Sequence, residues 1–259
     1  MFTFRVPKGV LLLTVPQHIW GLIGAAYYLY FGLLPLHTLA LTYVFWVLLG
    51  VVGMGIFFHK YWSHQSFTCS QVFAYIGTYL GCLCGMGPPI FWVALHNNHH
   101  HSHADQYPKD VHSPVAGLFS SYLMWHFKPF KLDLRGTRTL FNSRYLSFMT
   151  RYYYWIYWLS IAGLFLIKPW LPIFLILLPG CIHFHVESII ATFCHDKRFG
   201  YRNFETADNS VNIYWLGLLS WGSAFHNNHH QNPRAWDNAT HPLEVDFSAL
   251  IVRMIKRAS

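Results

Sequence analysis

The five-residue sequence His-Asn-Asn-His-His occurs twice in this chain, at residues 96–100 and again at residues 226–230. In an α-helix, positions i, i+3 and i+4 project from one face, so each copy would present three imidazoles to a common site. Imidazole nitrogens are ligands for zinc, copper and iron. The repeated motif therefore predicts metal binding, and it restricts the fold to one that brings distant histidines together.

A third pair of histidines, in the sequence HKYWSH, precedes both copies. The three motifs together offer more ligands than the three or four that one zinc ion needs. No acidic residue lies inside the motifs, which argues against a hydrolytic two-metal site. The nitrogen-rich set favours two iron ions, with zinc and copper as alternatives. The predicted ligands are His59, His64, His96, His99, His100, His226, His229 and His230.

Other polar residues in and around the motifs receive lesser roles. His101 and His103 extend the second motif but fall off its α-helical face, so we expect them to be exposed or to lie beside the ligands. We expect four asparagines to orient imidazole N–H groups through hydrogen bonds. These are Asn97, Asn98, Asn227 and Asn228. A lone histidine usually has a structural role, which we assign to His18, His37, His112, His126 and His241.

The composition indicates a membrane protein. Apolar residues make up 54% of the chain and charged residues 11%, against about 25% charged in typical soluble domains. The net charge of +8 comes without a basic stripe or a nucleic-acid recognition motif, so nucleic-acid binding is excluded. Apolar stretches long enough to cross a bilayer predict four transmembrane helices, and a shorter one an interfacial helix. The spans are about 10–34, 37–58, 152–167 and 173–194, and the interfacial helix is about 72–84.

The distribution of basic residues predicts the orientation. Of the 18 lysines and arginines, only Lys168 lies between the third and fourth spans. The others precede the first span, as Arg5 and Lys8 do, or lie between the second and third spans or after the fourth. The positive-inside rule then places both termini and every histidine motif in the cytoplasm. We therefore expect an all-α integral membrane protein, one domain over residues 1–259, whose four transmembrane helices carry a cytoplasmic helical cap with the histidine motifs.

The order of HKYWSH, HNNHH and HNNHH among four spans resembles the membrane-bound fatty acyl desaturase family, most closely its acyl-CoA delta-9 (stearoyl-CoA) type. The family pattern HxxxxH, HxxHH and HxxHH is matched at all eight positions, and the tracts FCHDKRFGYR and DNSVNIYWLGLLSWGSAF also resemble it. The resemblance implies a ninth iron ligand shortly after the last span, at His195. Ala191 departs from the pattern, because members often have an asparagine there that holds an iron through water. Asn228, another polar group or a different coordination would replace it.

The resemblance also implies a reaction. Two ferrous ions, with molecular oxygen as co-substrate, would introduce a carbon–carbon double bond into a fatty acyl thioester of coenzyme A or acyl carrier protein. Electrons would come from an external donor such as a ferredoxin or a b-type cytochrome. Trp92, Trp125 and Trp221 are candidates for the walls of the acyl tunnel. The compact chain favours a bacterial inner membrane over the endoplasmic reticulum.

Two alternatives remain open from the sequence. The same site could run a related oxidation of the acyl chain, as an acetylenase, a hydroxylase or a decarboxylase that forms terminal alkenes. A protein of another class, which binds or transports metal in the membrane, would place its ligands near the middle of the bilayer. The motifs here flank the predicted spans, which counts against transport.

Overall fold

Every regular element in the described residues, 9–35 and 37–257 of this computed structural model, is a helix. Outside the helices, the described chain makes only isolated β-bridges, such as the one between Tyr201 and Asn212. The all-α prediction is therefore confirmed. Arg5 and Lys8, which contributed to the predicted orientation, lie outside the described residues.

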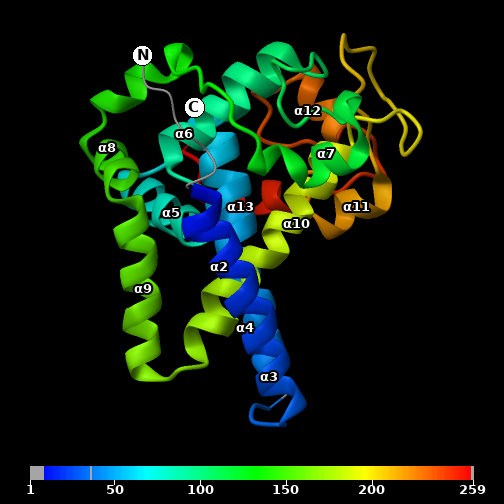
Figure 1. Ribbon diagram of the computed structural model, residues 1–259. Coiled ribbons are helices and arrows are strands. Elements are labelled where there is room, and N and C mark those ends of the chain that lie inside the picture. Colours follow the sequence, from blue (N-terminus) through cyan, green and yellow to red (C-terminus); the bar gives the residue numbers. More distant parts are fainter. Residues whose placement is uncertain (1–8, 36, 258–259) are drawn as a thin grey trace.

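Apolar helical segments extend in one direction from a lobe that holds the remaining helices (Figure 1). Large apolar side chains on these segments are exposed, including Trp20, Ile23 and Leu166, as expected of surfaces that contact lipid. The segments are η1 (Val10–Thr14), α2 (Val15–His18), η2 (Ile19–Ile23) and α3 (Gly24–Tyr30); α4 (His37–Trp46) and η3 (Val47–Ser63); α9 (Tyr153–Ile167); and η8 (Ile173–Leu177) with α10 (Leu178–Phe193).

Two continuous helices of the described chain, His37–Ser63 and Ile173–Phe193, are long and apolar enough to cross a membrane. The segment α9 is apolar but shorter. The structure thus supports two membrane-crossing helices, and the four-span arrangement stays a prediction.

The segment α9 is held against η3 and α2 by buried tyrosines. Tyr153 and Tyr157 are fully buried in a core that includes Phe58 of η3. The Tyr157 hydroxyl donates to Gln17 Oε1 at 2.8 Å, and the Gly87 N–H donates to the Tyr153 oxygen at 3.0 Å. Because both phenol groups have partners, they can be buried without the cost of an unmade hydrogen bond.

The helix predicted at 72–84 is present as α5 (Gln71–Leu83), and it packs closely against η3. A Cβ added to Gly53 would lie 2.4 Å from the Gly81 nitrogen, so the two backbones touch where both helices have glycine. This close approach returns the chain to the same end of η3. As a result, the first and second histidine motifs meet, with His64 Nε2 and His96 Nε2 2.9 Å apart.

A buried ion pair fixes the end of η3 next to His59. The Lys60 ammonium donates to Asp246 Oδ2 and to Ser248 Oγ, both at 2.7 Å. Ser248 belongs to α13 (Phe247–Ile255), near the C-terminus. Removing one partner of such a buried pair costs about 3–5 kcal/mol, so the contact secures the position of the first motif.

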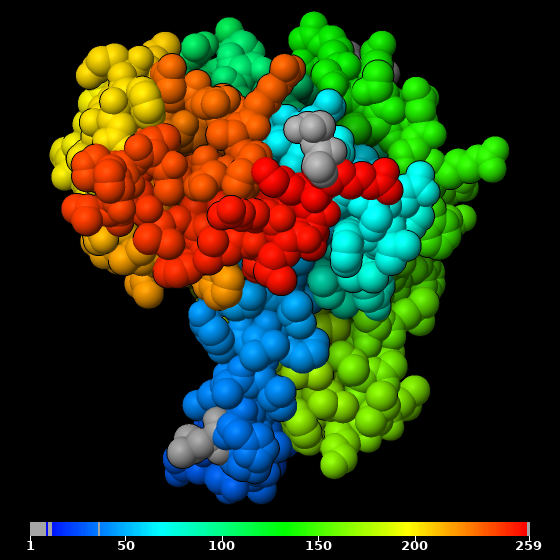
Figure 2. Space-filling model, turned by 180° about the vertical axis from the view of Figure 1, so that it is seen from behind, coloured from blue at the N-terminus to red at the C-terminus, as the bar shows by residue number. Residues whose placement is uncertain are grey.

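The remaining helices form the lobe around the histidine motifs. Seen from behind, the C-terminal third of the chain covers the lobe above the projecting α4 (Figure 2). The helices are α6 (Pro89–Ala94), η4 (Leu95–His101), η5 (Pro114–Ala116), α7 (Leu118–Tyr122), η6 (Met124–Phe127), η7 (Arg135–Asn142), α8 (Arg144–Arg151), α11 (Tyr214–Leu219) and α12 (His226–Gln231).

Candidate metal centre

The first copy of His-Asn-Asn-His-His lies in η4, which is a π-helix. Its hydrogen bonds join residues five apart, as when the Ser102 N–H donates to the Asn97 carbonyl. In this geometry positions i, i+4 and i+5 share a face, rather than i, i+3 and i+4. The face therefore carries His96, His100 and His101.

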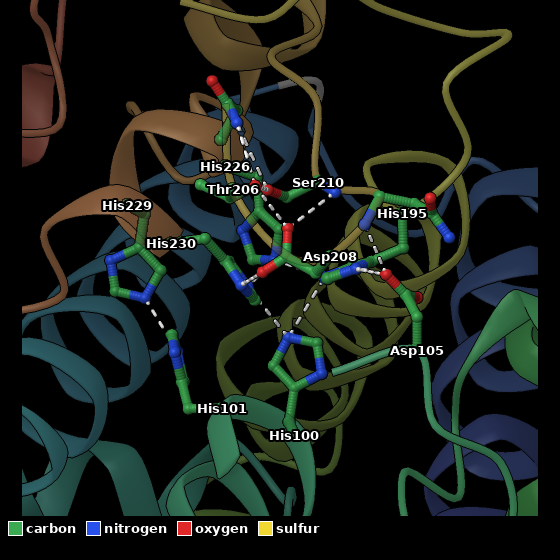
Figure 3. Close-up of polar contacts among 12 residues, drawn as sticks. His100, His101, Asp105, His195, Thr206, Asp208, Ser210, His226, His229 and His230 are labelled. Carbon is green, nitrogen blue, oxygen red and sulfur yellow. Dashed lines mark hydrogen bonds and ion pairs between the residues drawn. The ribbon is translucent and has the colours of Figure 1, made fainter. Parts of the chain in front are cut away.

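The second copy lies in α12, an ordinary α-helix. Here the expected i, i+3 and i+4 positions hold, and all three imidazoles point into the lobe, where they are buried or nearly so. His229 lies toward one group of histidines, whereas His226 and His230 lie toward another (Figure 3).

The first group, which we call the five-histidine cluster, draws on three helices. The Nε2 atoms of His59 and His229 are 3.0 Å apart, and those of His229 and His101 are also 3.0 Å apart. One potential ligand atom from each of the five residues lies within 4.8 Å of all the others. The cluster consists of His59, His64, His96, His101 and His229.

The second group, the four-histidine cluster, has its Nε2 atoms in a closed ring. The four successive separations, from His100 to His195, His226, His230 and back, are 3.1, 3.0, 3.1 and 3.2 Å. A ring with such edges has a centre roughly 1.9–2.2 Å from every nitrogen, which matches the ~2.0–2.1 Å of a metal–imidazole bond.

Three aspartates orient the imidazoles of this ring. His230 Nδ1 donates to Asp208 Oδ2 at 2.8 Å. The Nδ1 atoms of His195 and His100 approach Asp105 and Asp110, each at 3.3 Å. Because an ionised carboxylate can only accept, the proton sits on Nδ1 and the Nε2 lone pair faces the ring.

The surroundings keep these aspartates ionised. Burial alone would raise the pKa of Asp208, but hydrogen bonds from His230, Ser210 and Thr206 hold it well below its usual range (Figure 3). The pKa of Asp105 is also lowered, since its hydrogen bond from His195 and one from the Asn209 N–H outweigh burial. Lone pairs that face one another at 3.0–3.2 Å repel unless a cation lies between them. The donor set therefore fits a metal ion.

The five-histidine cluster has a different electrostatic environment. Burial and neighbouring imidazoles lower the pKa of His64 to about 3, and they lower the pKa of His96, His101 and His229 as well. These rings are therefore neutral, the form in which imidazole binds metals. His229 Nδ1 has no hydrogen-bond partner in the described chain. This cluster also fits a metal ion, but without the carboxylates that orient the other.

Two expectations about the histidines are corrected by this geometry. His99 lies outside both clusters: its Nδ1 contacts the Lys109 carbonyl at 3.0 Å, and its Nε2 accepts from the Asp133 N–H at 2.9 Å. His101, which we expected to lie outside the ligand set, occupies the place intended for His99. The cause is the π-helical turn. His195, which the resemblance implies as a ninth ligand, lies in the ring, and its role as an iron ligand stays a prediction.

The asparagines of the motifs do not contact imidazole nitrogens. Asn97 and Asn98 donate to the carbonyls of Ser63 and Asp133, at 3.0 and 2.6 Å. Asn227 and Asn228 bond to the loops that cover α12, for example to the Asn203 N–H and to Glu244. They position the helices, and the orienting role that we expected of them falls to the aspartates. The tracts HADQYPKD and ADNS contain these aspartates, so the signal was present in the sequence.

A cavity of about 210 Å³, partly open to solvent, reaches the five-histidine cluster at His96. Trp92 and Trp125 line it, together with His96 and His112, and their role as walls of an acyl tunnel stays a prediction. Trp92 stacks on His96, with ring centroids 5.1 Å apart. Trp221 lies elsewhere, against Phe247 at the start of α13, where the Ser248 N–H donates to the Trp221 carbonyl.

Comparison with known proteins agrees with this site. A family model described as fatty acid desaturase matches residues 11–243. The delta-9 acyl-lipid desaturase 1 of Arabidopsis thaliana is 31% identical over 80% of this chain and 68% of its own length. An acyl-CoA C20 delta5-desaturase of Anemone leveillei is 27% identical, over 82% and 70% respectively. The sn-1 stearoyl-lipid 9-desaturase of Anabaena variabilis is 27% identical, over 99% and 89%.

The buried histidine clusters indicate metal binding, and the family is membrane-associated and acts on fatty acyl chains. The chain therefore belongs to the fatty acid desaturase family and is an oxidoreductase, a fatty acyl desaturase.

Proposed function

We propose that the two clusters hold two iron ions and that the protein uses molecular oxygen to desaturate a fatty acyl chain. The observation that carries the proposal is the presence of two adjacent, buried nitrogen-donor clusters joined through the neighbours His100 and His101. When bound, the iron pair supplies the oxidising power that removes two hydrogens from adjacent methylenes. Neutral imidazoles with open positions suit iron that reacts with oxygen.

Different residues of this chain would have different roles in the reaction. The histidines hold the metals as neutral donors, and Asp105, Asp110 and Asp208 fix the direction of three of them. Trp92 packs against His96 at the cavity wall, where it would position the chain against the centre and limit the access of water. Two electrons per turnover would come from a one-electron carrier such as a ferredoxin or a b-type cytochrome.

The arrangement of the helices supports a four-span topology with the clusters in the cytoplasm. The α3–α4 and α9–η8 turns lie at the same end of the molecule, and the histidine lobe lies at the other (Figure 1). Lys168 lies in the α9–η8 turn, at the end away from the lobe. The other described lysines and arginines lie between the second and third predicted spans or after the fourth. The positive-inside rule then orients the lobe to the cytoplasm. We propose a single domain, in a bacterial inner membrane.

Product analysis tests this function. The protein is expressed in a host that lacks the relevant unsaturated product, and acyl chains from coenzyme A, carrier protein and lipid fractions are analysed by mass spectrometry. We expect an alkene, formed only in oxygen, in one fraction. Relatives include both acyl-lipid and acyl-CoA desaturases, so the fraction identifies the carrier. An alkyne, a hydroxylated chain or a terminal alkene would instead identify one of the related oxidations.

Metal analysis of the same protein tests the cofactor. We expect two irons per chain and loss of activity in His100→Ala. One zinc per chain, with activity retained by His100→Ala, would contradict the di-iron proposal. Metal uptake into vesicles without any acyl product would favour the transport alternative.

A further inference from the structure

The cavity that reaches the five-histidine cluster has a polar wall, although a saturated acyl chain needs only apolar contacts. Most of its lining is apolar, including Leu13, Phe91 and Trp92. Polar side chains nevertheless line it as well: Thr14, His112, His126, Tyr154, Glu187 and Ser188. An acyl chain of methylenes alone has no partner for these groups.

Glu187 is the carboxylate of this wall. It lies on α10, within a helix apolar enough to cross a membrane, where ionisable residues usually face an internal cavity and have a function. Its side chain is 29% exposed, and it lines the cavity, so the exposed part faces this space.

Protein groups leave the Glu187 carboxyl incompletely paired. Its ion-pair contact in the described chain is His183 Nε2 at 3.4 Å, longer than the about 2.7–2.9 Å of a charge-assisted hydrogen bond. His183 is itself 4% exposed and packs against η3, where a Cβ on Gly50 would come 2.5 Å from its Nδ1. The His183 imidazole is therefore confined in its place beside the carboxyl. The Glu187 carboxyl keeps free hydrogen-bonding capacity on the side that faces the cavity.

Filling this cavity with an unsubstituted chain would remove water from the carboxyl without replacing its hydrogen bonds, which is costly. A hydroxyl on the chain would replace them, because it can donate to a carboxylate and accept from a protonated carboxyl. Ala191, one turn along α10, also lines the cavity, with a small apolar side chain.

We propose that the preferred substrate is a hydroxylated acyl chain and that Glu187 binds its hydroxyl group, an inference that rests on the proposed desaturation at the adjacent clusters. Glu187 lies six residues before the end of α10 at Phe193, a rise of about 9 Å, and His195 of the four-histidine cluster follows two residues after that end. The hydroxyl would therefore lie several carbons from the pair that is oxidised. Hydroxylation of the acyl chain must then precede this reaction.

The test is a binding measurement on the metal-loaded enzyme without an electron donor, so that no turnover occurs. The probes are a saturated long-chain fatty acid and the positional series of its monohydroxy derivatives, with Kd measured for each in detergent. We expect at least one hydroxy isomer to bind about tenfold or more tightly than the parent, as one hydrogen bond to a charged group allows.

Substitutions test whether Glu187 causes the preference for a hydroxylated chain. Glu187→Leu should remove the difference between the isomer and the parent, whereas Glu187→Gln, which keeps polar atoms at that place, should retain most of it. Glu205→Leu is the matched control, because Glu205 is exposed on the surface. Equal binding of the parent and every isomer, or a preference that persists in Glu187→Leu, would overturn the proposal. If the enzyme meanwhile desaturates the parent chain, the desaturase function stands and only the substrate class fails.

Discussion

The two copies of His-Asn-Asn-His-His have the same sequence but different helical geometry. In the π-helix η4, the first copy contributes His96 and His100 and recruits His101 from beyond the motif. In the α-helix α12, the second copy contributes all of its own histidines. A motif thus shows which imidazoles are available, whereas the backbone hydrogen bonds decide which of them share a face.

The copies also differ in how firmly they are held. Asn228 is buried, accepts from Asn203 and Asn212, and donates to Asn238 and Glu244. Asn98 is half-buried, and its side-chain amide donates one hydrogen bond, to the Asp133 carbonyl. The second copy is therefore fixed by a dense polar network, and the first mainly by the packing of its helix.

The largest expected effect separates His101 from His99. His101→Ala should reduce desaturation by at least about a hundredfold, more than the loss of a residue that only orients a ligand. His99→Ala should change the rate by less than about tenfold, since it removes contacts to Lys109 and Asp133 but no cluster member. Rates are compared by mass spectrometry of the acyl product at equal protein and metal content. Loss of activity in His99→Ala with activity retained in His101→Ala would contradict this assignment. It would support the α-helical face with His96, His99 and His100 instead.

The next effect concerns the carboxylate that orients the second copy. Asp208→Asn should weaken metal binding about ten- to a hundredfold, because it removes the charge that directs His230 Nε2 into the ring. Metal affinity is measured by competition with a chelator. Asp196→Asn is the control, since Asp196 pairs with exposed Arg198 at the surface. Equal metal affinities of both variants and the wild type would show that Asp208 does not contribute to metal binding.

The third effect is a pH dependence of the metal-free protein. Burial lowers the pKa of His230 to about 4 and that of His64 to about 3. At these two histidines the unfolded chain binds protons below about pH 6.5 and the folded chain does not, so their contribution to stability is full above that pH and falls as the pH drops toward 4. Each group contributes up to about 1.4 kcal/mol per pH unit. Thermal unfolding of the metal-free protein between these pH values should show a falling Tm, and metal saturation should flatten the curve. A Tm that rises on acidification would contradict the assignment of neutral imidazoles.

The smallest effect compares the asparagines. Asn228→Ala should cost about 2 kcal/mol of stability, because it leaves several buried partners unpaired, whereas Asn98→Ala should cost about 1 kcal/mol. Denaturant or thermal unfolding of the metal-loaded variants measures the difference. Equal costs would mean that the two copies are held alike.

Much of the site follows from the sequence because its candidate nitrogen ligands are histidines at short, regular spacings. His59, His64 and the second copy could be assigned in this way, and the all-helical class followed from the apolar stretches. The sequence could not decide between His99 and His101 as the cluster member. The histidines at 99–101 are consecutive, so which of them share a face with His96 depends on whether the helix is α or π, and the helix type depends on packing. The aspartates lie in loops whose course depends on the whole fold, as the contact between Asp105 and the Asn209 N–H shows.

The cavity was the least predictable part. Trp92 and Trp125 line it, but Trp221 has the same aromatic character and packs elsewhere. His112 and His126, to which the sequence assigned structural roles, line the cavity as well. Periodicity describes one helix at a time, whereas a cavity is bounded by segments from several.

The most direct test of the two-cluster account is an anomalous scattering experiment at the iron edge on crystals of the metal-loaded enzyme. The account predicts two peaks, one bound by His59, His64, His96, His101 and His229, the other by His100, His195, His226 and His230. A single peak, or a peak bound by His99 in place of His101, would contradict it.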